Sequence, residues 1–265
     1  MNMREQFLRE VAAAGLPAGP DRVDVITEQD LISLPPPAQR YLSFMGVVGR
    51  PRDWSFRLGF RGRFRIKPQD PWMRCETWQY NSRLALARIF HIRIRMLGLV
   101  PVIARDTYIG GRGRMLVKAL DLFTIADGTG EQFDIGELVT YLSDAVLVAP
   151  SMLLVPEVSW APCDSNSFAV MLTDHDRRVT ARVFVDERGA PLDFSTTDRF
   201  CYDPDRPKQL VRARWSTPVS GWSDLDGVSR PTGAQAVWHL PQGPFTYADF
   251  HLIPGTAAFN VHPGV

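Results

Sequence analysis

The chain has 265 residues, a formal net charge of +1, 45% hydrophobic residues and 11% aromatic residues. This length is enough for a large buried core, and we expect one large domain rather than two small ones. Because 30 Lys and Arg nearly balance 29 Asp and Glu, no global field attracts nucleic acid, and we predict no nucleic-acid partner. The three cysteines are far apart and form no CxxC pair, which argues against a disulfide framework or a zinc knuckle.

The first 50 residues are predicted to form a helical flank or lid. Residues 3–14 place their apolar side chains on one helical face and end at a Gly- and Pro-rich stretch. A second helix is predicted to begin at Thr27, whose hydroxyl can cap its first turn. A third is predicted after the prolines at 35–37, because proline suits the first turn of a helix.

Charged side chains interrupt the apolar residues of the N-terminus. Glu5, Arg9 and Glu10 occupy the place where a signal peptide has an uninterrupted apolar region. No later stretch combines the length and the lack of charge of a membrane-spanning helix. We therefore predict a cytoplasmic protein without a membrane span.

Residues 54–67, WSFRLGFRGRFRIK, show strand periodicity over an unusually long run. Apolar or glycine residues take the even positions, and mostly cationic residues take the odd positions. Successive strand side chains point to opposite faces, so this segment has one aromatic face and one cationic face. It is predicted to be a half-buried antiparallel strand, with its cations on a solvated face and not on a nucleic-acid site.

Further strands are predicted at 72–80, 83–96, 101–109 and 114–126, with the glycines at 110–113 as a turn. Those glycines lie between two strands and not before a helix, which argues against a phosphate loop. The inner face of the sheet is predicted to bury six side chains. They are Phe56, Phe60, Phe64, Leu86, Phe90 and Ile92.

The period changes to that of a helix after residue 133. Asp134 and Glu137 have the spacing of a capping box, and the apolar residues that follow predict one buried helix over 134–149, ended by Pro150. From Val158 onward, turn residues separate five or six further strands. The predicted fold is mainly β (α+β): a large curved antiparallel sheet, half-barrel or barrel, with a plugging helix and N-terminal helices. We divide it into a helical flank, residues 1–50, and one β-rich ligand-pocket domain, residues 51–265.

Four local phrases resemble a bacterial family of uncharacterised domains: LPPPAQRYLSFMGV at 34–47, RDTYIGGRGRM at 105–115, ELVTYLSDA at 137–145, and the pair Asp198-Arg199. The resemblance implies a curved antiparallel sheet with helices on its concave side, similar to half-barrel (LolA-like) carriers of lipoproteins or lipids. It implies no catalytic residues. The chain departs from the family's pattern at Asp144 and Leu147.

The usual catalytic and metal-binding motifs are missing from the sequence. The five histidines have no HxH or HExxH spacing, and neither a GxSxG elbow nor a Rossmann fingerprint occurs. We therefore predict no metal and no cofactor.

Charged and polar residues within the apolar strands and helix form the candidate site. A buried charge is costly unless it is paired or hydrated, so these residues are expected either to pair with one another or to line a water-filled cavity. The predicted proton donors or acceptors are Asp144, Glu76 and Asp106. The predicted ligand-binding residues are Tyr108, Trp78, Arg88, Arg105, Trp238 and Tyr141. The alternative is that these charged residues form structural ion pairs under the sheet.

Two functions follow from this pattern. The first is a cofactor-independent cyclase or isomerase, in which a β-rich pocket encloses a lipid-, terpenoid- or polyketide-like metabolite and one or two acids move protons. The alternative is a non-enzymatic carrier or binding protein for a hydrophobic small molecule. Both predict an apolar ligand as the partner of this chain.

Overall fold

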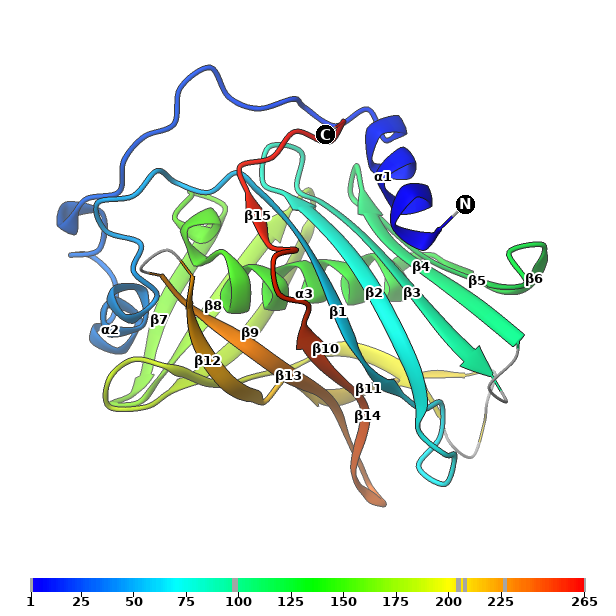
Figure 1. The fold of residues 1–265 in the computed structure, drawn as a ribbon. Helices are drawn as coiled ribbons and strands as arrows, with labels where there is room; N and C mark the ends of the chain where they lie inside the picture. The colour runs from blue at the N-terminus through cyan, green and yellow to red at the C-terminus, as the bar shows by residue number, and fades with distance from the viewer. Residues whose placement is uncertain (1, 97–99, 204–205, 207–208, 226–227, 265) are drawn as a thin grey trace. The chain divides into compact units, whose positions relative to one another are not determined.

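The computed structural model describes residues 2–96, 100–203, 206, 209–225 and 228–264 (Figure 1). The α-helices are α1 (Met3–Ala13), α2 (Pro36–Phe44) and α3 (Glu131–Val148), and the 3-10 helices are η1 (Glu28–Asp30) and η2 (Pro150–Leu153). The strands are β1 (Ser55–Phe64), β2 (Met73–Ser82), β3 (Ala87–Met96), β4 (Val100–Ile109), β5 (Arg112–Ala119), β6 (Phe123–Thr129), β7 (Val158–Asp164), β8 (Ser167–Asp174), β9 (Arg177–Val185), β10 (Pro191–Tyr202), β11 (Leu210–Ser216), β12 (Val219–Leu225), β13 (Val228–Leu240), β14 (Gly243–Leu252) and β15 (Ala258–Phe259).

The strands are hydrogen-bonded in the order β6-β5-β4-β3-β2-β1-β14-β13-β11-β10-β9-β8-β7, with β12 on β13 and β15 on β1, in a sheet of 15 strands. The predicted class, a mainly β fold with one large antiparallel sheet and accompanying helices, is confirmed. The chain forms two compact units. Unit 1 contains residues 1–21, 54–141 and 247–265, and unit 2 contains residues 22–53 and 142–246. The predicted division into a flank of residues 1–50 and a domain of residues 51–265 stays a prediction.

The alternating segment at 54–67 becomes β1, which pairs with β2 and β14 in unit 1. Its apolar side chains point to one face of the sheet and its cations to the other, as the periodicity predicted. Phe56 is fully buried, whereas Phe60 and Phe64 are half-buried on the same face. Phe90 and Ile92 of β3 are also buried there.

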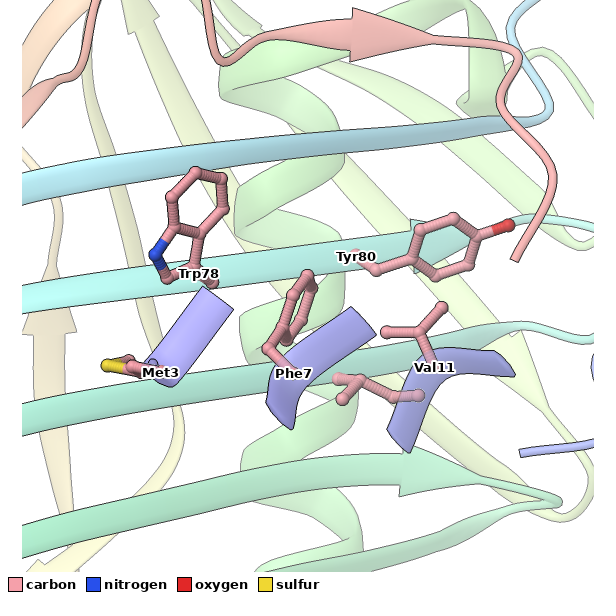
Figure 2. Packing of buried hydrophobic residues seen from close by; sticks show 6 residues of the cluster. Met3, Phe7, Val11, Trp78 and Tyr80 are labelled. Carbon is pink, nitrogen blue, oxygen red and sulfur yellow. The ribbon is translucent and has the colours of Figure 1, made fainter. Parts of the chain in front are cut away.

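Helix α1 covers the cationic face of unit 1 (Figure 2). Met3, Phe7 and Val11 are one helical turn apart and pack against Trp78 and Tyr80 of β2, which point to this face. Asn2 and Glu5 form a capping box at the helix N-terminus. The predicted amphipathic helix over residues 3–14 is confirmed.

The first part of α3, up to Tyr141, lies on the opposite face of unit 1. Its Asp134 carboxylate accepts a hydrogen bond of 2.7 Å from the backbone N–H of Gly113 and lies 3.3 Å from Arg112. The predicted helix is confirmed, but it begins at Glu131, so the capping box assigned to Asp134 and Glu137 is wrong. Neither residue caps the helix, because each contacts the sheet instead.

Two predicted strands have different bounds in the structure. Residues 83–86 form a turn in which Leu86 has a φ of +43°, so Leu86 lies outside β3 and not on its inner face. Residues 114–126 do not form one strand, because a turn at Leu120 and Asp121, both with positive φ, separates β5 from β6. Neither turn contains glycine or proline, so the sequence gives no turn signal at these positions.

Unit 2 is built on β7–β13 with α2 and the end of α3. Tyr41 of α2 is buried, its hydroxyl donates a hydrogen bond of 2.7 Å to the carbonyl of Val146, and its ring contacts Phe168 and Trp160. The helix predicted at Thr27 is the single turn η1. From Val158 onward, the described residues form the strands β7–β15, which is more than the five or six predicted. One reason is that residues 209–222, predicted as a single strand, form β11 and part of β12.

Candidate functional site

An apolar cluster lies on the α3 side of the unit 1 sheet. We use this name for buried and half-buried side chains of β1–β4 and β14 that contact one another: Cys75, Phe90, Ile92, Ile94, Phe64, Met73, Ala104 and Phe250. They share a face because their strand partners point the same way; Cys75 pairs with Ile94, and Ala104 with Ile92. The sheet therefore presents a continuous hydrocarbon surface at this place.

Aromatic rings form the half-buried part of this cluster. Phe250 of β14 stacks on Phe60 with ring centroids 6.2 Å apart and contacts Phe90 at 6.5 Å. Phe64 meets Tyr247 edge to face at 5.7 Å. Phe60, Phe64 and Phe250 keep part of their surface accessible. These rings offer an apolar contact area to a molecule that lies on the sheet.

One buried polar group lies within this apolar surface. Thr77 pairs with Phe60 on one side and Ile92 on the other, and it is fully buried. Its hydroxyl has no hydrogen-bond partner among the residues that the structure describes. Two residues further along β2, the Gln79 side chain donates a hydrogen bond of 3.0 Å to Asn81. A ligand oxygen above Thr77 would give that hydroxyl a partner.

The thiol in the apolar cluster is not a nucleophile. Burial, together with the negative charge of Asp249, raises the pKa of Cys75 to about 12. Since the thiolate is the reactive form, Cys75 stays an inert thiol at neutral pH. The cluster therefore provides shape and contact area, and not covalent chemistry.

An ion pair lies between the sheet and α3 in unit 1. Arg88 of β3 and Glu137 of α3 are 2.9 Å apart, with side chains only 4% and 8% exposed. The Arg88 guanidinium also lies over the ring of Phe90, at 4.7 Å. This geometry attaches α3 to the sheet, so Arg88 has a structural role in addition to any contact with a ligand.

Three of the predicted site residues lie on the opposite face, beside α1. Trp78 is covered by Phe7, and its indole N–H donates a hydrogen bond of 2.9 Å to Glu76. Arg105 lies 2.8 Å from Asp121 and 3.6 Å from Glu10 of α1. These side chains hold α1 and a turn in place.

Glu76 and Asp106 are not brought together. Asp106 is half-buried and pairs with Phe90, so it points to the face of the apolar cluster, whereas Glu76 pairs with Arg93 and points to the α1 face. Because the sheet separates the two carboxylates, they cannot act on one substrate as a pair. Tyr108 is fully buried on the same face as Asp106, and Tyr141 is buried on α3.

The last two predicted residues, Asp144 and Trp238, belong to unit 2. Asp144 is half-buried on α3. Trp238 lies beside Trp215, and the guanidinium of Arg199 is 4.0 Å from the Trp215 ring and 5.6 Å from the Trp238 ring. Nη1 of Arg199 is buried and donates no hydrogen bond to the described residues. An anionic group is the natural counterpart of such a cation.

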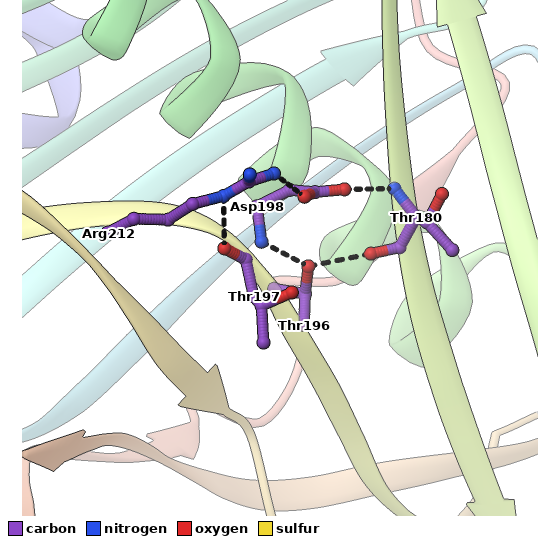
Figure 3. Close-up of polar contacts among 5 residues, drawn as sticks. All are labelled: Thr180, Thr196, Thr197, Asp198 and Arg212. Atoms are coloured by element: carbon purple, nitrogen blue, oxygen red, sulfur yellow. Dashed lines mark hydrogen bonds and ion pairs between the residues drawn. The ribbon is translucent and has the colours of Figure 1, made fainter.

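The carboxylate of the neighbouring residue Asp198 points toward Thr180 and Arg212 (Figure 3). It accepts hydrogen bonds from the backbone N–H of Thr180, at 2.8 Å, and from Arg212. Asp198 and Arg199 are consecutive in β10 and therefore do not form the ion pair that their sequence suggests. Strand geometry, and not sequence adjacency, decides their partners.

One titratable group was missed by the sequence analysis. Burial raises the pKa of the Asp193 carboxyl to about 6, although backbone hydrogen bonds from Phe194 and Thr217 and the charge of Arg214 lower it. Asp193 is one of two acids in the segment 191–200, and its position in a strand was the only available signal. It can change charge near neutral pH.

A small pocket in unit 2 is lined by residues that include Asp30, Arg52, Leu154 and Trp160 and has a volume of about 230 Å³. Ligand pockets typically measure about 300–1,000 Å³, so this one is too small for a lipid. Among the described residues, no three His, Cys, Asp or Glu side chains are placed to hold a metal ion. In the same part of the chain, no helix is both long and apolar enough to cross a membrane.

Fold and site together define a mainly antiparallel β protein that presents an aromatic cluster on one face of its sheet. Residues 24–250 match the model of a family described as a family of unknown function (DUF6544), and the chain belongs to this family. The predicted membership of an uncharacterised family is confirmed.

Comparison with curated proteins gave no match. Among solved structures, the chain is similar to a LolA superfamily protein from Nitrosomonas europaea, with 12% identity over 86% of this chain and 92% of that chain and a TM-score of 0.42.

Proposed function

We propose that the protein binds and carries a hydrophobic small molecule whose apolar part lies on the apolar cluster of unit 1. The observation that carries this proposal is the half-buried stack of Phe60 and Phe250 above buried Phe90 and Ile92. Covering such a surface with ligand carbon gains about 25 cal/mol per Å² of apolar area removed from water.

The polar groups near this face support a ligand that is mostly apolar. Thr77 offers one hydroxyl without a partner among the described residues, enough to orient a single oxygen of the ligand. The Cys75 thiol is neutral. A site with a large apolar wall and one convergent polar group is typical of lipid- and terpenoid-binding proteins.

Replacing the half-buried rings of Phe60 and Phe250 tests this proposal. We expect Phe250→Asn and Phe60→Asn each to weaken binding of an anthracene-labelled fatty acid about tenfold, which corresponds to ~1.4 kcal/mol of lost apolar contact. Fluorescence titration measures the affinity. Mass spectrometry of molecules that co-purify with the wild type, and are lost from the Asn variants, would identify the natural ligand.

The matched controls are Phe250→Leu and Phe60→Leu, which keep most of the apolar area and are expected to bind within about threefold of the wild type. Circular dichroism separates lost binding from lost folding. Unchanged affinity in folded Asn variants would show that the ligand does not lie on this surface.

The second candidate function is the cyclase or isomerase that the sequence suggested. Half-buried Asp144 on α3 supports it, because partial removal from water favours a carboxyl that can exchange a proton with a bound substrate. Asp144 is preferred over Glu76, whose carboxylate already accepts hydrogen bonds from Arg93 and Trp78 on the other face of the unit 1 sheet. The location of the protein in the cytoplasm also stays a prediction.

Asp144→Asn separates the carrier from the enzyme. The substitution keeps the size of the side chain and removes its titratable proton. An enzyme that uses Asp144 is expected to lose turnover of a polyene or lipid substrate by roughly 10²-fold or more while retaining affinity. A carrier is expected to hold its ligand as before. Conversion by Asp144→Asn at the wild-type rate would exclude this catalytic role.

A further inference from the structure

Large apolar side chains are exposed at one end of unit 1. We use the name apolar tip for six residues at the β3–β4 and β5–β6 ends: Met96, Val100, Leu120, Leu122, Phe123 and Ile125. Their exposed fractions run from 37% for Met96 to 75% for Leu122. A contiguous apolar patch on a protein surface marks a site that binds a membrane or another molecule.

The two parts of the apolar tip lie side by side. Met96 and Val100 are strand partners across β3 and β4. The N–H of Leu120 donates a hydrogen bond of 2.9 Å to the carbonyl of Pro101, which joins the β5–β6 turn to the start of β4. Phe123 opposes Ala119 at the start of β6. The six side chains therefore form one patch and not isolated exposures.

The β5–β6 turn is held in a strained conformation that keeps its leucines outside. Leu120 and Asp121 have φ values of +53° and +58°, which are unfavourable for side chains larger than glycine. The Asp121 carboxylate is bound by Arg105 at 2.8 Å and by Gln6 of α1 at 2.6 Å. Asp121 thus anchors the turn while Leu120 and Leu122 remain in solvent. Strain retained in this way is typical of functional turns.

Two cations lie at the same end of the sheet, on its other face. Arg95 is exposed and precedes Met96, and Lys118 is the strand partner of Thr124, so both point to the face opposite Met96, Val100 and Phe123. Neither cation forms an ion pair with the described part of the chain. The acids close by are already neutralised: Asp121 by Arg105, as above, and Asp127 by Arg114 at 2.7 Å. This end of the sheet is thus apolar on one face and cationic on the other.

We propose that the apolar tip docks on the surface of a bilayer that contains anionic lipid, with Leu120, Leu122 and Phe123 at the level of the headgroups. Apolar side chains beside unpaired cations are the combination that binds such a surface. A second copy of the chain fits less well. β6 ends the strand order, but its register with β5 shifts at Val117 and Lys118, and an irregular edge strand opposes pairing with another edge.

Vesicle partition of the full chain tests the proposal. Wild-type protein is expected to float with vesicles of phosphatidylcholine and phosphatidylglycerol and to partition at least tenfold less to phosphatidylcholine alone. Leu122→Gln combined with Phe123→Gln is expected to reduce partition at least tenfold without adding charge. Arg95→Gln combined with Lys118→Gln is expected to remove the preference for phosphatidylglycerol. Leu192→Gln, at an exposed apolar site of unit 2, is the control and is expected to bind as the wild type.

Direct contact is measured with Phe123→Trp. The fluorescence of the introduced tryptophan is the difference between the variant and the wild type. Vesicles with brominated acyl chains are expected to quench this difference for Phe123→Trp and to leave it unchanged for Leu192→Trp. Equal partition of the Gln pair at the tip and Leu192→Gln, or equal quenching of the two Trp variants, would overturn the proposal. Sedimentation that shows a wild-type dimer abolished by the Gln pair, without vesicle binding, would overturn it in favour of self-association. Phe250→Asn is expected to keep vesicle binding, so this proposal and ligand binding fail independently.

Discussion

Gly113→Ala is expected to lower the free energy of unfolding by about 3–5 kcal/mol. A Cβ at this position would lie 2.2 Å from the carbonyl oxygen of Phe133 and 2.8 Å from the backbone nitrogen of Asp134. Backbone atoms cannot turn away as a side chain can. The start of α3 must therefore leave the sheet, and the 2.7 Å hydrogen bond between Gly113 and Asp134 is lost. Denaturant unfolding followed by circular dichroism measures the change.

Two other glycines near the start of α3 provide a graded control. At Gly128 the added Cβ would meet the Phe133 ring at 2.2 Å, and a ring can shift, so Gly128→Ala is expected to cost less than Gly113→Ala. Gly136 has no atom within 4 Å of the added Cβ and lies inside the helix. Gly136→Ala is expected to stabilise the protein by roughly 0.5–1 kcal/mol. A destabilisation that is equal at all three positions would contradict close packing at Gly113.

Removing one partner of the buried ion pair between β3 and α3 is also expected to lower the stability of the protein strongly. Arg88→Met is expected to destabilise the protein by about 3–5 kcal/mol, because it leaves the Glu137 carboxylate buried at 8% exposure without its guanidinium. Glu137→Gln is expected to cost less, because the amide can still accept a hydrogen bond from Arg88. The midpoint of denaturant unfolding at neutral pH measures both changes.

The double variant Arg88→Met with Glu137→Leu decides what the pair contributes. It is expected to recover most of the lost stability, because an apolar pair of similar volume needs no compensation for buried charge. The exposed pair of Arg114 and Asp127 is the matched control, and Arg114→Met is expected to leave the unfolding midpoint unchanged. If the double variant is as unstable as Arg88→Met alone, the cost comes from lost packing and not from charge.

Strand alternation predicted most of the sheet. The even and odd positions of residues 54–67 separate in the structure as they do in the sequence, and Phe56, Phe90 and Ile92 are buried together. Short-range rules failed where turns lack the usual residues. Leu86 and Leu120 both have positive φ. The turn at Leu86 shortens the strand predicted at 83–96, and the turn at Leu120 divides the strand predicted at 114–126.

The candidate site could be predicted only as a set of unusual residues. Asp198 and Arg199 are adjacent in the chain, yet Asp198 binds Arg212 and Arg199 stacks on Trp215. The exposure of Phe250 had no signal in its own strand, because its accessibility depends on Phe60 and Phe90 from strands distant in sequence.

The mainly β class, the amphipathic α1, the helical segment of α3 and the two faces of β1 are predictable from the sequence, because they depend on local periodicity and neighbouring residues. The partners of the charged groups depend on the three-dimensional fold. Glu137 binds Arg88 from 49 positions away, and Asp134 binds the N–H of Gly113 from 21 positions away. Such partners are set by strand register and by the helix that docks on it, and no short-range pattern encodes either distance.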